Sequence, residues 1–530
     1  MRTFASYGPI DTDNHYYAPR TALLDDACRQ LMGEDPTKSG HYITVWAPRQ
    51  TGKSWVMQQV VARLKQSDEF DVALLTMQSA KSIKTEQGIL RLLVNNLTRW
   101  FRRDFPQIER WDELVDLFNP PYFSKPLVLM LDEFDALQEE HINLFANEFR
   151  NIYTQRLNEP DKPSGEKSCL LHGLALIGVR SVLGIENVSG SPFNVQRSLH
   201  IPNLTPAEVA GMFHWYEQES GQTFAPGVID RVIAEMQGQP GLTCWLGELL
   251  TQQYNRGEAV ITQQDFATVY GAALDLLPNN NILNLISKAK QEPYKSLVLE
   301  LFRTNSKLFF RYDDPRTNFL YMNGVIEPAV EEDTQRYLKF ASPFVQKRLF
   351  YYFANETFGT LDPRSAPFAD LSDTITAQDV NLPNLLRRYE DYLRENRDWL
   401  LKNAPRRNTD FRIFEAVYHF NLYYYLVRFL ESYKAQVTPE FPTGNGKLDL
   451  LIRHAGRLFG IEVKSFGNLV EYQAALAQTA QYAQQLQLTE ITLALFIDAV
   501  DEENRRKYEQ LYIDPQTGVV VSPVFVITGT

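Results

Sequence analysis

The sequence predicts an α/β fold whose first core is a parallel sheet between layers of helices, and three apolar runs support this prediction. Residues 127–131 (LVLML) and 174–179 (LALIGV) are continuous apolar runs, which are typical of central parallel strands because those strands are buried on both faces. The run at residues 43–46 ends abruptly in a loop, and residues 55–64 then have a helical pattern. This order of strand, loop and helix indicates the βαβ units of an open α/β sheet.

The loop after the first of these strands, APRQTGKS at residues 47–54, has the chemistry of a phosphate-binding loop. Its backbone N–H groups and the N-terminus of the next helix can point at an anion. Lys53 can reach the β- and γ-phosphates of a nucleotide, and the Ser54 hydroxyl can ligate Mg²⁺. Ala47 stands where the GxxxxGK[ST] pattern has its first glycine. The residues expected to hold the nucleotide are Pro48, Arg49, Gln50, Thr51, Gly52, Lys53 and Ser54.

An acidic pair, Asp132 and Glu133, follows the apolar run at residues 127–131. Ligands bind at the C-terminal ends of strands in open α/β sheets, so this pair is expected beside the phosphate loop. Asp132 is expected to hold Mg²⁺ through water or through Ser54, and Glu133 to orient or deprotonate an attacking water. The sequence therefore predicts a magnesium site made by Ser54 and Asp132.

Length and composition limit the classes of function. A chain of 530 residues exceeds what one core usually supports, so roughly three or four domains are expected. The balance of 53 Lys and Arg against 65 Asp and Glu gives a net charge of −12, which argues against a protein that coats nucleic acid non-specifically. Three scattered cysteines favour a reducing, cytoplasmic setting, and no apolar run approaches the ~18 residues of a membrane span. The sequence leaves open whether the chain forms a homo-oligomer.

Two further positions around the nucleotide have two interpretations each. His15 and Tyr16, in the lead-in to the phosphate loop, could stack on the base or hydrogen-bond to it, or could simply pack this segment down. Arg180, directly after the run at residues 174–179, could sense the γ-phosphate or merely cap its strand.

The middle of the chain predicts a helical lid and a winged helix. A helical segment is expected to begin near Thr205. Within it, the helix-breaking sequence GQPG at residues 238–241 would separate two helices and set the direction of the N-terminus of the second one. Short strand-like runs then alternate with helices, and their scattered basic residues favour a structural winged helix over a DNA-binding one. The expected lid helices are Pro206–Ser220, 226–236 and 242–255, and the expected strand-like runs are 307–312, 318–326 and 337–340.

The C-terminal part holds a second chemical centre. Two strands are expected at residues 447–453 and 457–463, joined by a turn, so Asp449 can converge with Glu462 and Lys464. Glu462 and Lys464 project to the same face because they are two residues apart on one strand. Asp449 and Glu462 could coordinate Mg²⁺ or Mn²⁺, while Lys464 could hold or activate the water that attacks a phosphodiester.

Two helices are expected to support this centre. Residues 411–433 are apolar nearly all round, which predicts a buried helix in which the charge of Glu415 needs a metal or a partner. A second helix, at residues 469–485, carries Gln478 and Tyr482 four residues apart, so both are expected on one face, toward the substrate or the lysine.

These residues resemble two known families. APRQTGKS, LMLDEFDAL, LIGVR and GQPGL, within residues 4–355, resemble the P-loop ATPases of the AAA-like and STAND group, which are related to archaeal and origin-recognition ATPases. GKLDLLIR, GIEVKSF and QTAQY, within residues 408–526, are similar to the PD-(D/E)XK nuclease superfamily. The first resemblance implies ATP with Mg²⁺, a nucleotide role for Lys53, Ser54, Asp132 and Glu133, a sensor at Arg180 and a lid marked by Pro240. The second implies catalysis by Asp449, Glu462 and Lys464, with Glu415 and Gln478 in support, and DNA as the partner.

The expected fold is thus a P-loop NTPase sheet with a helical lid and a winged helix, followed by an α/β restriction-endonuclease-like domain. The expected function is an AAA-like ATPase coupled to a metal-dependent nuclease that acts on DNA. The alternative is a STAND-like signalling or interaction ATPase whose C-terminal domain binds nucleic acid without cleaving it. The expected domains are 1–204 (ATPase core), 205–280 (lid), 281–355 (winged helix), 356–407 (linker and connector helix) and 408–530 (nuclease-like domain).

Overall fold

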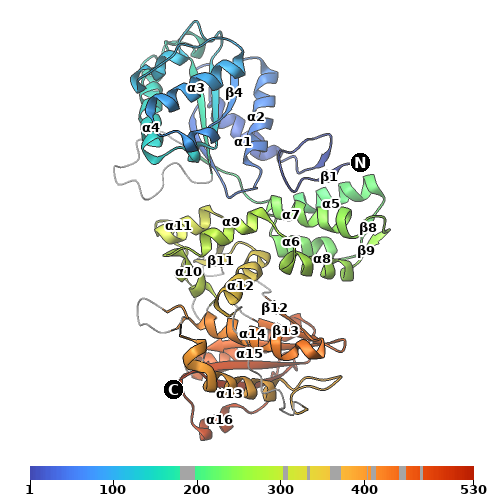
Figure 1. Ribbon diagram of the computed structural model, residues 1–530. Helices are drawn as coiled ribbons and strands as arrows, with labels where there is room; N and C mark the ends of the chain where they lie inside the picture. Colours follow the sequence, from blue (N-terminus) through green and yellow to red (C-terminus); the bar gives the residue numbers. More distant parts are fainter. Residues whose placement is uncertain are drawn as a thin grey trace. The chain divides into compact units, whose positions relative to one another are not determined.

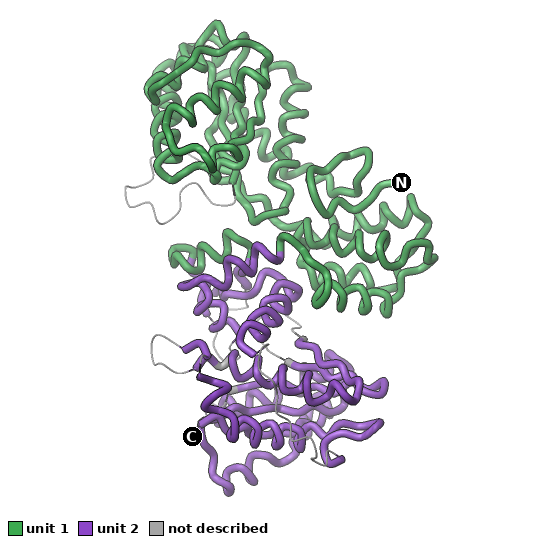
Figure 2. Tube along the Cα trace, in the orientation of Figure 1, with its two compact units in different colours: residues 1–281, 312–324 green, residues 282–311, 325–530 purple. Residues whose placement is uncertain are grey.

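The computed structural model divides into two compact units, residues 1–281 with 312–324 and residues 282–311 with 325–530 (Figure 2). The boundaries of the five predicted domains remain predictions. The residues that the structure describes are 1–178, 197–302, 308–330, 335–358, 372–402, 404–406, 413–440, 449–465 and 469–529.

A parallel sheet forms the core of the first unit, with strand order β4-β5-β6-β3-β7 among the described residues (Figure 1). Strand β6 therefore lies between the strand that leads to the phosphate loop, β3, and the strand that leads to the acidic pair, β5. The parallel strands predicted around the loop are confirmed. Their bounds are β3 Tyr42–Trp46, β4 Asp71–Thr76, β5 Leu127–Asp132, β6 Leu171–Gly178 and β7 Arg197–His200.

Helices cover both faces of this sheet, as the continuous apolar runs predict (Figure 1). Leu129 and Leu131 of β5 belong to one buried cluster, with the helices α3 (Glu86–Phe101) and α4 (Glu139–Leu157). Val128 and Met130, which alternate with them, belong to another cluster, with the helices α1 (Thr21–Met32) and α2 (Lys53–Ser67). Successive side chains of a strand point to opposite faces, so β5 has no polar face to expose.

The predicted helical segment after Thr205 is confirmed. Helix α5 begins directly after its N-cap, Thr205. The Thr205 side chain accepts a hydrogen bond from the Glu208 N–H, and the Glu208 carboxylate accepts one from the Thr205 N–H. The N-terminal strands β1 (Thr3–Phe4) and β2 (His15–Tyr16) contact this segment, where the Phe4 ring packs on Phe213 with centroids 4.8 Å apart. Its elements are α5 Pro206–Ser220, α6 Val228–Met236, α7 Pro240–Glu248, a π-helical segment Leu249–Tyr254 and α8 Gln263–Asp275.

One predicted strand is a helix. The run expected at residues 318–326 is helix α11 (Pro315–Met322), followed by strand β10 (Ile326–Val330). The helix forms because the Asp314 carboxylate accepts from the backbone N–H groups of Arg316 and Thr317, both at 2.9 Å, and proline suits the first helical position. The other elements of this stretch are α9 Asn280–Ala289, α10 Tyr294–Leu301, β11 Arg336–Phe340 and α12 Pro343–Phe358.

The second unit is built on a mixed sheet with the order β12-β13-β14-β15-β17-β16 among the described residues. Strands β13 and β14 form the predicted antiparallel pair, and β14, β15 and β17 run parallel. The strand bounds are β12 Gln436–Glu440, β13 Asp449–His454, β14 Arg457–Ser465, β15 Glu490–Ile497, β16 Tyr512–Ile513 and β17 Val520–Ile527. The helix bounds are α13 Leu382–Leu400, α14 Glu415–Leu430, α15 Leu469–Gln485 and α16 Glu502–Tyr508. Within the described residues, none of the helices has the length and apolar character needed to cross a bilayer.

A chain of hydrogen bonds between buried side chains in the first unit fixes the protonation state of His172. Arg156 Nη2 donates to Ser164 Oγ at 2.7 Å, so the serine hydroxyl is left to donate to His172 Nδ1, also at 2.7 Å. The other ring nitrogen then donates to the carbonyl oxygen of Met32 at 3.0 Å. Burial, together with the charges of Arg156 and Lys167, lowers the pKa of His172 to about 4. This histidine is neutral in the folded protein.

Acid is therefore expected to destabilise the first unit through His172. Below its ordinary pKa of 6.5 the unfolded chain takes up a proton that the folded chain refuses until about pH 4. The free energy of unfolding then falls as the pH is lowered, by up to about 1.4 kcal/mol per pH unit. Melting temperatures at pH 7, 6 and 5 should fall less for His172→Gln than for wild type, whereas the exposed His214→Gln should follow wild type. Equal acid sensitivity of wild type and His172→Gln would contradict this assignment.

Candidate functional site

The phosphate loop lies between β3 and α2 and is shaped by two residues with positive φ. Gln50 has a φ of 57° and Gly52 a φ of 87°, so the chain turns sharply before the helix begins at Lys53. The Lys53 ammonium donates to the carbonyl oxygens of Ala47 at 2.8 Å and Pro48 at 2.7 Å. The predicted lysine thus lies inside the loop that it is expected to serve.

The charge of Lys53 is sensitive to its surroundings. Burial lowers the pKa of Lys53 to about 8, and the nearby carboxylates of Asp135 and Asp132 oppose this shift. The cation is therefore only partly compensated by the protein itself. An anion placed against the loop would complete the compensation, which is what a phosphate group supplies.

The acidic pair meets the loop across the sheet. Ser54 Oγ donates to Asp132 Oδ2 at 2.6 Å, although β6 separates their strands in the sheet order. The other Asp132 oxygen accepts from the Glu133 N–H at 2.8 Å, and the Glu133 carboxylate accepts from Thr76 Oγ1 at 2.9 Å. Glu133 has a φ of 55°, a left-handed conformation that costs about 1–2 kcal/mol in an ordinary residue. The two predicted magnesium ligands thus come within hydrogen-bond distance, and their metal role stays a prediction.

The helical lid contacts the phosphate loop directly. Gln239 Nε2 donates to the carbonyl oxygen of Arg49 at 3.0 Å and lies 3.3 Å from that of Gln50. The Gly241 N–H also donates to the Gln50 carbonyl oxygen, at 3.0 Å. The Gly- and Pro-rich sequence at residues 238–241 predicts that a helix begins here. No local feature of the sequence predicts that this helix N-terminus contacts the phosphate loop.

The structure adds His200 to the surroundings of Lys53, and Arg20 lies near His200. His200 ends β7, and its ring stacks on Trp46 with centroids 4.2 Å apart. Burial, together with Arg20 and Lys53, lowers the pKa of His200 to about 4. Arg20 is itself buried and donates to the carbonyl oxygen of Pro202 at 2.8 Å. His200 belongs to no motif singled out in the sequence, so only proximity in the fold identifies it.

The lead-in residues are placed as the packing interpretation expects. Tyr16 is fully buried, its ring contacts Phe4 and Trp215, and its hydroxyl donates to the Glu219 carboxylate at 3.1 Å. His15 Nδ1 accepts from a backbone N–H of its own segment. A contact of His15 or Tyr16 with a nucleotide base stays a prediction, and Arg180 lies outside the described residues.

In the second unit, β13 and β14 bring the predicted catalytic residues into register. Asp449 pairs directly with Glu462 in the antiparallel ladder. Lys464 Nζ lies 2.9 Å from Glu462 Oε1, and the two side chains are 5% and 0% exposed. The predicted convergence of Glu462 and Lys464 on one face of β14 is therefore observed. The structure does not describe the side chains of Asp449 and Glu415.

Helix α14 contributes a residue that the sequence did not single out. His419, one turn after Glu415, is fully buried, and neither of its ring nitrogens has a hydrogen-bond partner in the described part of the chain. Burial and the charge of Lys464 lower the pKa of His419 to about 3, while Glu462 acts in the opposite direction. His419 thus lies close to the Glu462–Lys464 pair. A histidine four residues after the predicted glutamate is the signal that could have identified it.

The helix predicted at residues 469–485 is α15 (Leu469–Gln485), on which Gln478 and Tyr482 are about one turn apart. Gln478 is exposed and Tyr482 is 3% exposed, so the boundary of the buried stripe of this helix falls between them. A contact of either side chain with a substrate or with Lys464 stays a prediction. Among the side chains that the structure describes, no group of three His, Cys, Asp or Glu residues is arranged to hold a metal ion.

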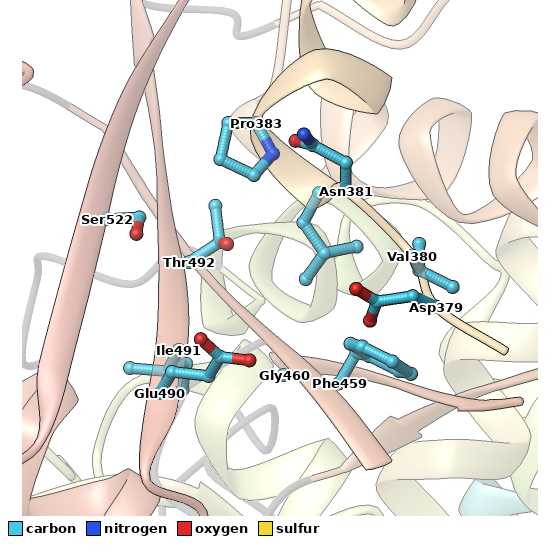
Figure 3. Close-up of a pocket in the computed structure, with 11 residues that line it drawn as sticks. Asp379, Val380, Asn381, Pro383, Phe459, Gly460, Glu490, Ile491, Thr492 and Ser522 are labelled. Atoms are coloured by element: carbon cyan, nitrogen blue, oxygen red, sulfur yellow. The ribbon is translucent and has the colours of Figure 1, made fainter. Parts of the chain in front are cut away.

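A separate pocket of about 250 Å³ is lined by residues near the N-terminal ends of β14 and β15 (Figure 3), and Lys464 is not among its lining residues. Two carboxylates at its mouth, Asp379 and Glu490, both pair with Arg457, at 2.8 and 3.8 Å. The Arg457 guanidinium also lies over the Phe459 ring, 5.0 Å from its centroid. The charges around this pocket are therefore compensated within the protein, and we assign it no ligand.

Comparisons with known proteins found one matching family model and several solved structures of similar fold. A family model described as an AAA-like domain matches residues 5–290. The chain is similar in fold to a Walker-type ATPase of Pyrococcus abyssi, with 12% identity and a TM-score of 0.43 over 65% of this chain and 99% of that chain. It is also similar to the ORC1 protein of Aeropyrum pernix, solved in complex with DNA, with 15% identity and a TM-score of 0.30 over 63% of this chain and 92% of that chain. A further similar structure is that of Cdc6p from Pyrobaculum aerophilum, with 15% identity and a TM-score of 0.34 over 66% of this chain and 97% of that chain. No curated protein matches the chain in sequence.

Proposed function

The chain belongs to the family of AAA-like domains, and on this premise we propose that it is an ATPase coupled to a metal-dependent nuclease domain that acts on DNA. The first unit would bind and hydrolyse ATP with Mg²⁺, and the second would cleave phosphodiesters. The observation that supports the proposal most strongly is the hydrogen bond between Ser54 and Asp132, at 2.6 Å, beside the Lys53 ammonium.

This arrangement fits the chemistry of phosphoryl transfer. Lys53 would bind the β- and γ-phosphates, and Ser54 and Asp132 would hold the magnesium ion on their oxygens. The bound cation would neutralise negative charge on the phosphates. Glu133, held by Thr76 Oγ1 at 2.9 Å, would orient or deprotonate the attacking water. Its left-handed backbone is consistent with this role, because strained conformations cluster at functional sites.

The nuclease proposal is supported by the Glu462–Lys464 pair, by the register of Asp449 with Glu462, and by buried His419. Asp449 and Glu462 would supply oxygen ligands for Mg²⁺ or Mn²⁺, with Glu415 in support, and such a cation would polarise the scissile phosphate. Lys464 would orient the attacking water or stabilise the negative charge on the phosphate. Gln478, exposed on α15, would contact the DNA backbone.

A second candidate is a signalling or interaction ATPase whose nuclease-like domain binds nucleic acid without cutting it. One observation favours it: Glu462 and Lys464 are almost fully buried and are paired with each other. An ion pair of this kind can persist as a structural element.

Coupling between the two activities is expected to appear as ATP-dependent cleavage. Plasmid cleavage with Mg²⁺ or Mn²⁺ should change at least fivefold when ATP is added to wild type, and this change should disappear in Lys53→Ala, because that variant lacks the phosphate-binding cation. The measurement is the initial cleavage rate of circular, linear, single-stranded and branched DNA, each with and without ATP. Equal rates in wild type and Lys53→Ala, with and without ATP, would refute coupling.

A further inference from the structure

We infer that Gln239, on the lid, is a positioning residue that holds the phosphate loop in the shape required for binding nucleotide phosphates. The inference rests on the proposed ATP-binding function. It adds to that function a specific link between two parts of the first unit, because Gln239 touches the loop and no reacting atom. We call the contact of Gln239 and Gly241 with the carbonyl groups of Arg49 and Gln50 the lid–loop clasp.

The Gln239 side chain has two ends with different tasks. Its oxygen accepts from the Leu242 N–H at 2.6 Å, which caps the N-terminus of α7. Its nitrogen donates to Arg49 and lies within hydrogen-bond distance of Gln50, at 3.0 and 3.3 Å. A carboxylate could perform the first task, since it only accepts, but could not perform the second.

The clasp controls where the loop's N–H groups point. In a planar trans peptide the C=O and the N–H point in opposite directions. The carbonyl of Arg49 shares a peptide with the N–H of Gln50, and the carbonyl of Gln50 shares one with the N–H of Thr51. When the lid holds both carbonyls toward itself, these two N–H groups must point away from the lid. N–H groups presented by such a loop are what bind a phosphate.

The other carbonyls of the loop are held from a different side. Lys53 Nζ bonds to the carbonyls of Ala47 and Pro48, and Thr51 Oγ1 also donates to Pro48, at 2.9 Å. When Lys53 moves to a phosphate, Thr51 can keep its bond to Pro48. In the bonds described here, only the lid holds the carbonyls of Arg49 and Gln50, so the support of these two carbonyls does not depend on Lys53.

The lid backbone also approaches the loop so closely that only glycine fits. A Cβ atom on Gly241 would lie 2.6 Å from Gln50 Oε1 and 2.7 Å from Gln50 Cβ. Gln50 has a left-handed φ of 57°, which an isolated residue of its type disfavours by about 1 kcal/mol or more. The hydrogen bonds of the clasp offset this strain. Loss of the clasp would therefore free Gln50 to leave its conformation.

The test uses Gln239→Glu in the full chain, because this change keeps the helix cap and removes the donor. ATP affinity, measured by fluorescence titration of a labelled ATP, is expected to fall about tenfold, since two neutral hydrogen bonds give way to repulsion between oxygens. In ATP hydrolysis the KM should rise by a similar factor while kcat stays within about twofold. Tripolyphosphate should lose affinity as much as ATP does, because the affected N–H groups face phosphate and not the base.

Gln237→Glu is the matched control. It adds the same charge two residues away, at an exposed side chain that bonds to the carbonyl oxygen of Ala234 and not to the loop. Its ATP affinity should stay within twofold of wild type. Gly241→Ala, which pushes the lid off the loop without adding charge, should lower affinity in the same direction as Gln239→Glu.

The outcomes separate this inference from the proposed function. If wild type does not bind ATP, or Lys53→Ala binds it as well as wild type does, the ATP-binding proposal itself fails. If wild type binds ATP and both Gln239→Glu and Gly241→Ala bind it equally well, the clasp has no positioning role. A fall in kcat at unchanged KM would also overturn the inference, because it would place Gln239 in the chemical step.

Discussion

Lys53→Ala is expected to weaken ATP binding by about a hundredfold or more and to abolish ATP hydrolysis. The lysine is the cation nearest the loop carbonyls, and hydrogen bonds between charged groups contribute about 1.5–3 kcal/mol each. Loss of contacts to two phosphates therefore corresponds to at least two orders of magnitude in affinity. Fluorescence titration with labelled ATP and a phosphate-release assay measure the two effects.

Two further variants make this result specific. Lys81→Ala removes one positive charge from an exposed position and should leave both activities unchanged. Glu133→Gln should keep ATP affinity within a few fold and lower kcat by about a hundredfold or more, because it removes a base and leaves the phosphate contacts in place. ATP hydrolysis that survives Lys53→Ala would remove the phosphate loop from the mechanism.

The elements around the phosphate loop are predictable because their signals are local. The apolar run at residues 127–131 lies within β5, and the predicted lid helix Pro206–Ser220 has the observed bounds. In the last case Thr205, proline at the first helical position and Glu208 form a capping box that fixes the start. The acidic pair is placed correctly for the same reason, since it directly follows a strand that has no polar face.

The contacts that complete the site are not local, and the sequence does not reveal them. Gln239 meets Arg49 across 190 residues of chain, so the breaker that contains it predicts a helix start but not its partner. His200 comes near Lys53 only because β7 pairs with β3. The strand order is a property of the whole sheet, and no single segment encodes it.

The predicted strand-like run at residues 318–326 was wrong because a local pattern competes with other signals. Residues 318–326 contain aromatic and apolar residues that favour a strand, but the cap at Asp314 and the proline after it begin a helix that continues through them. Gln478 and Tyr482 are four residues apart, yet the boundary of the buried face of α15 falls between them. Spacing predicts that two side chains are neighbours, whereas burial depends on what packs against the helix.

Lys464→Ala is expected to abolish DNA cleavage by the second unit, with a loss of about a thousandfold or more. The lysine lies 2.9 Å from Glu462, and charge stabilisation or water activation by one group contributes about two to four orders of magnitude in rate. The measurement is plasmid cleavage with Mg²⁺ or Mn²⁺. Lys434→Ala, at a lysine in the turn between α14 and β12, is the control and should cleave at the wild-type rate.

The burial of this pair decides how the experiment must be designed. Removal of Lys464 alone leaves the Glu462 carboxylate buried without its cation, which commonly costs about 3–5 kcal/mol, so lost cleavage could reflect unfolding. The double change Glu462→Gln and Lys464→Met removes both charges at similar volume, and such replacements are often neutral or stabilising. If the double variant keeps the melting temperature of wild type and does not cleave, the pair is catalytic. If it cleaves, the pair is structural, and if wild type itself never cleaves, the alternative of a signalling or interaction ATPase is favoured.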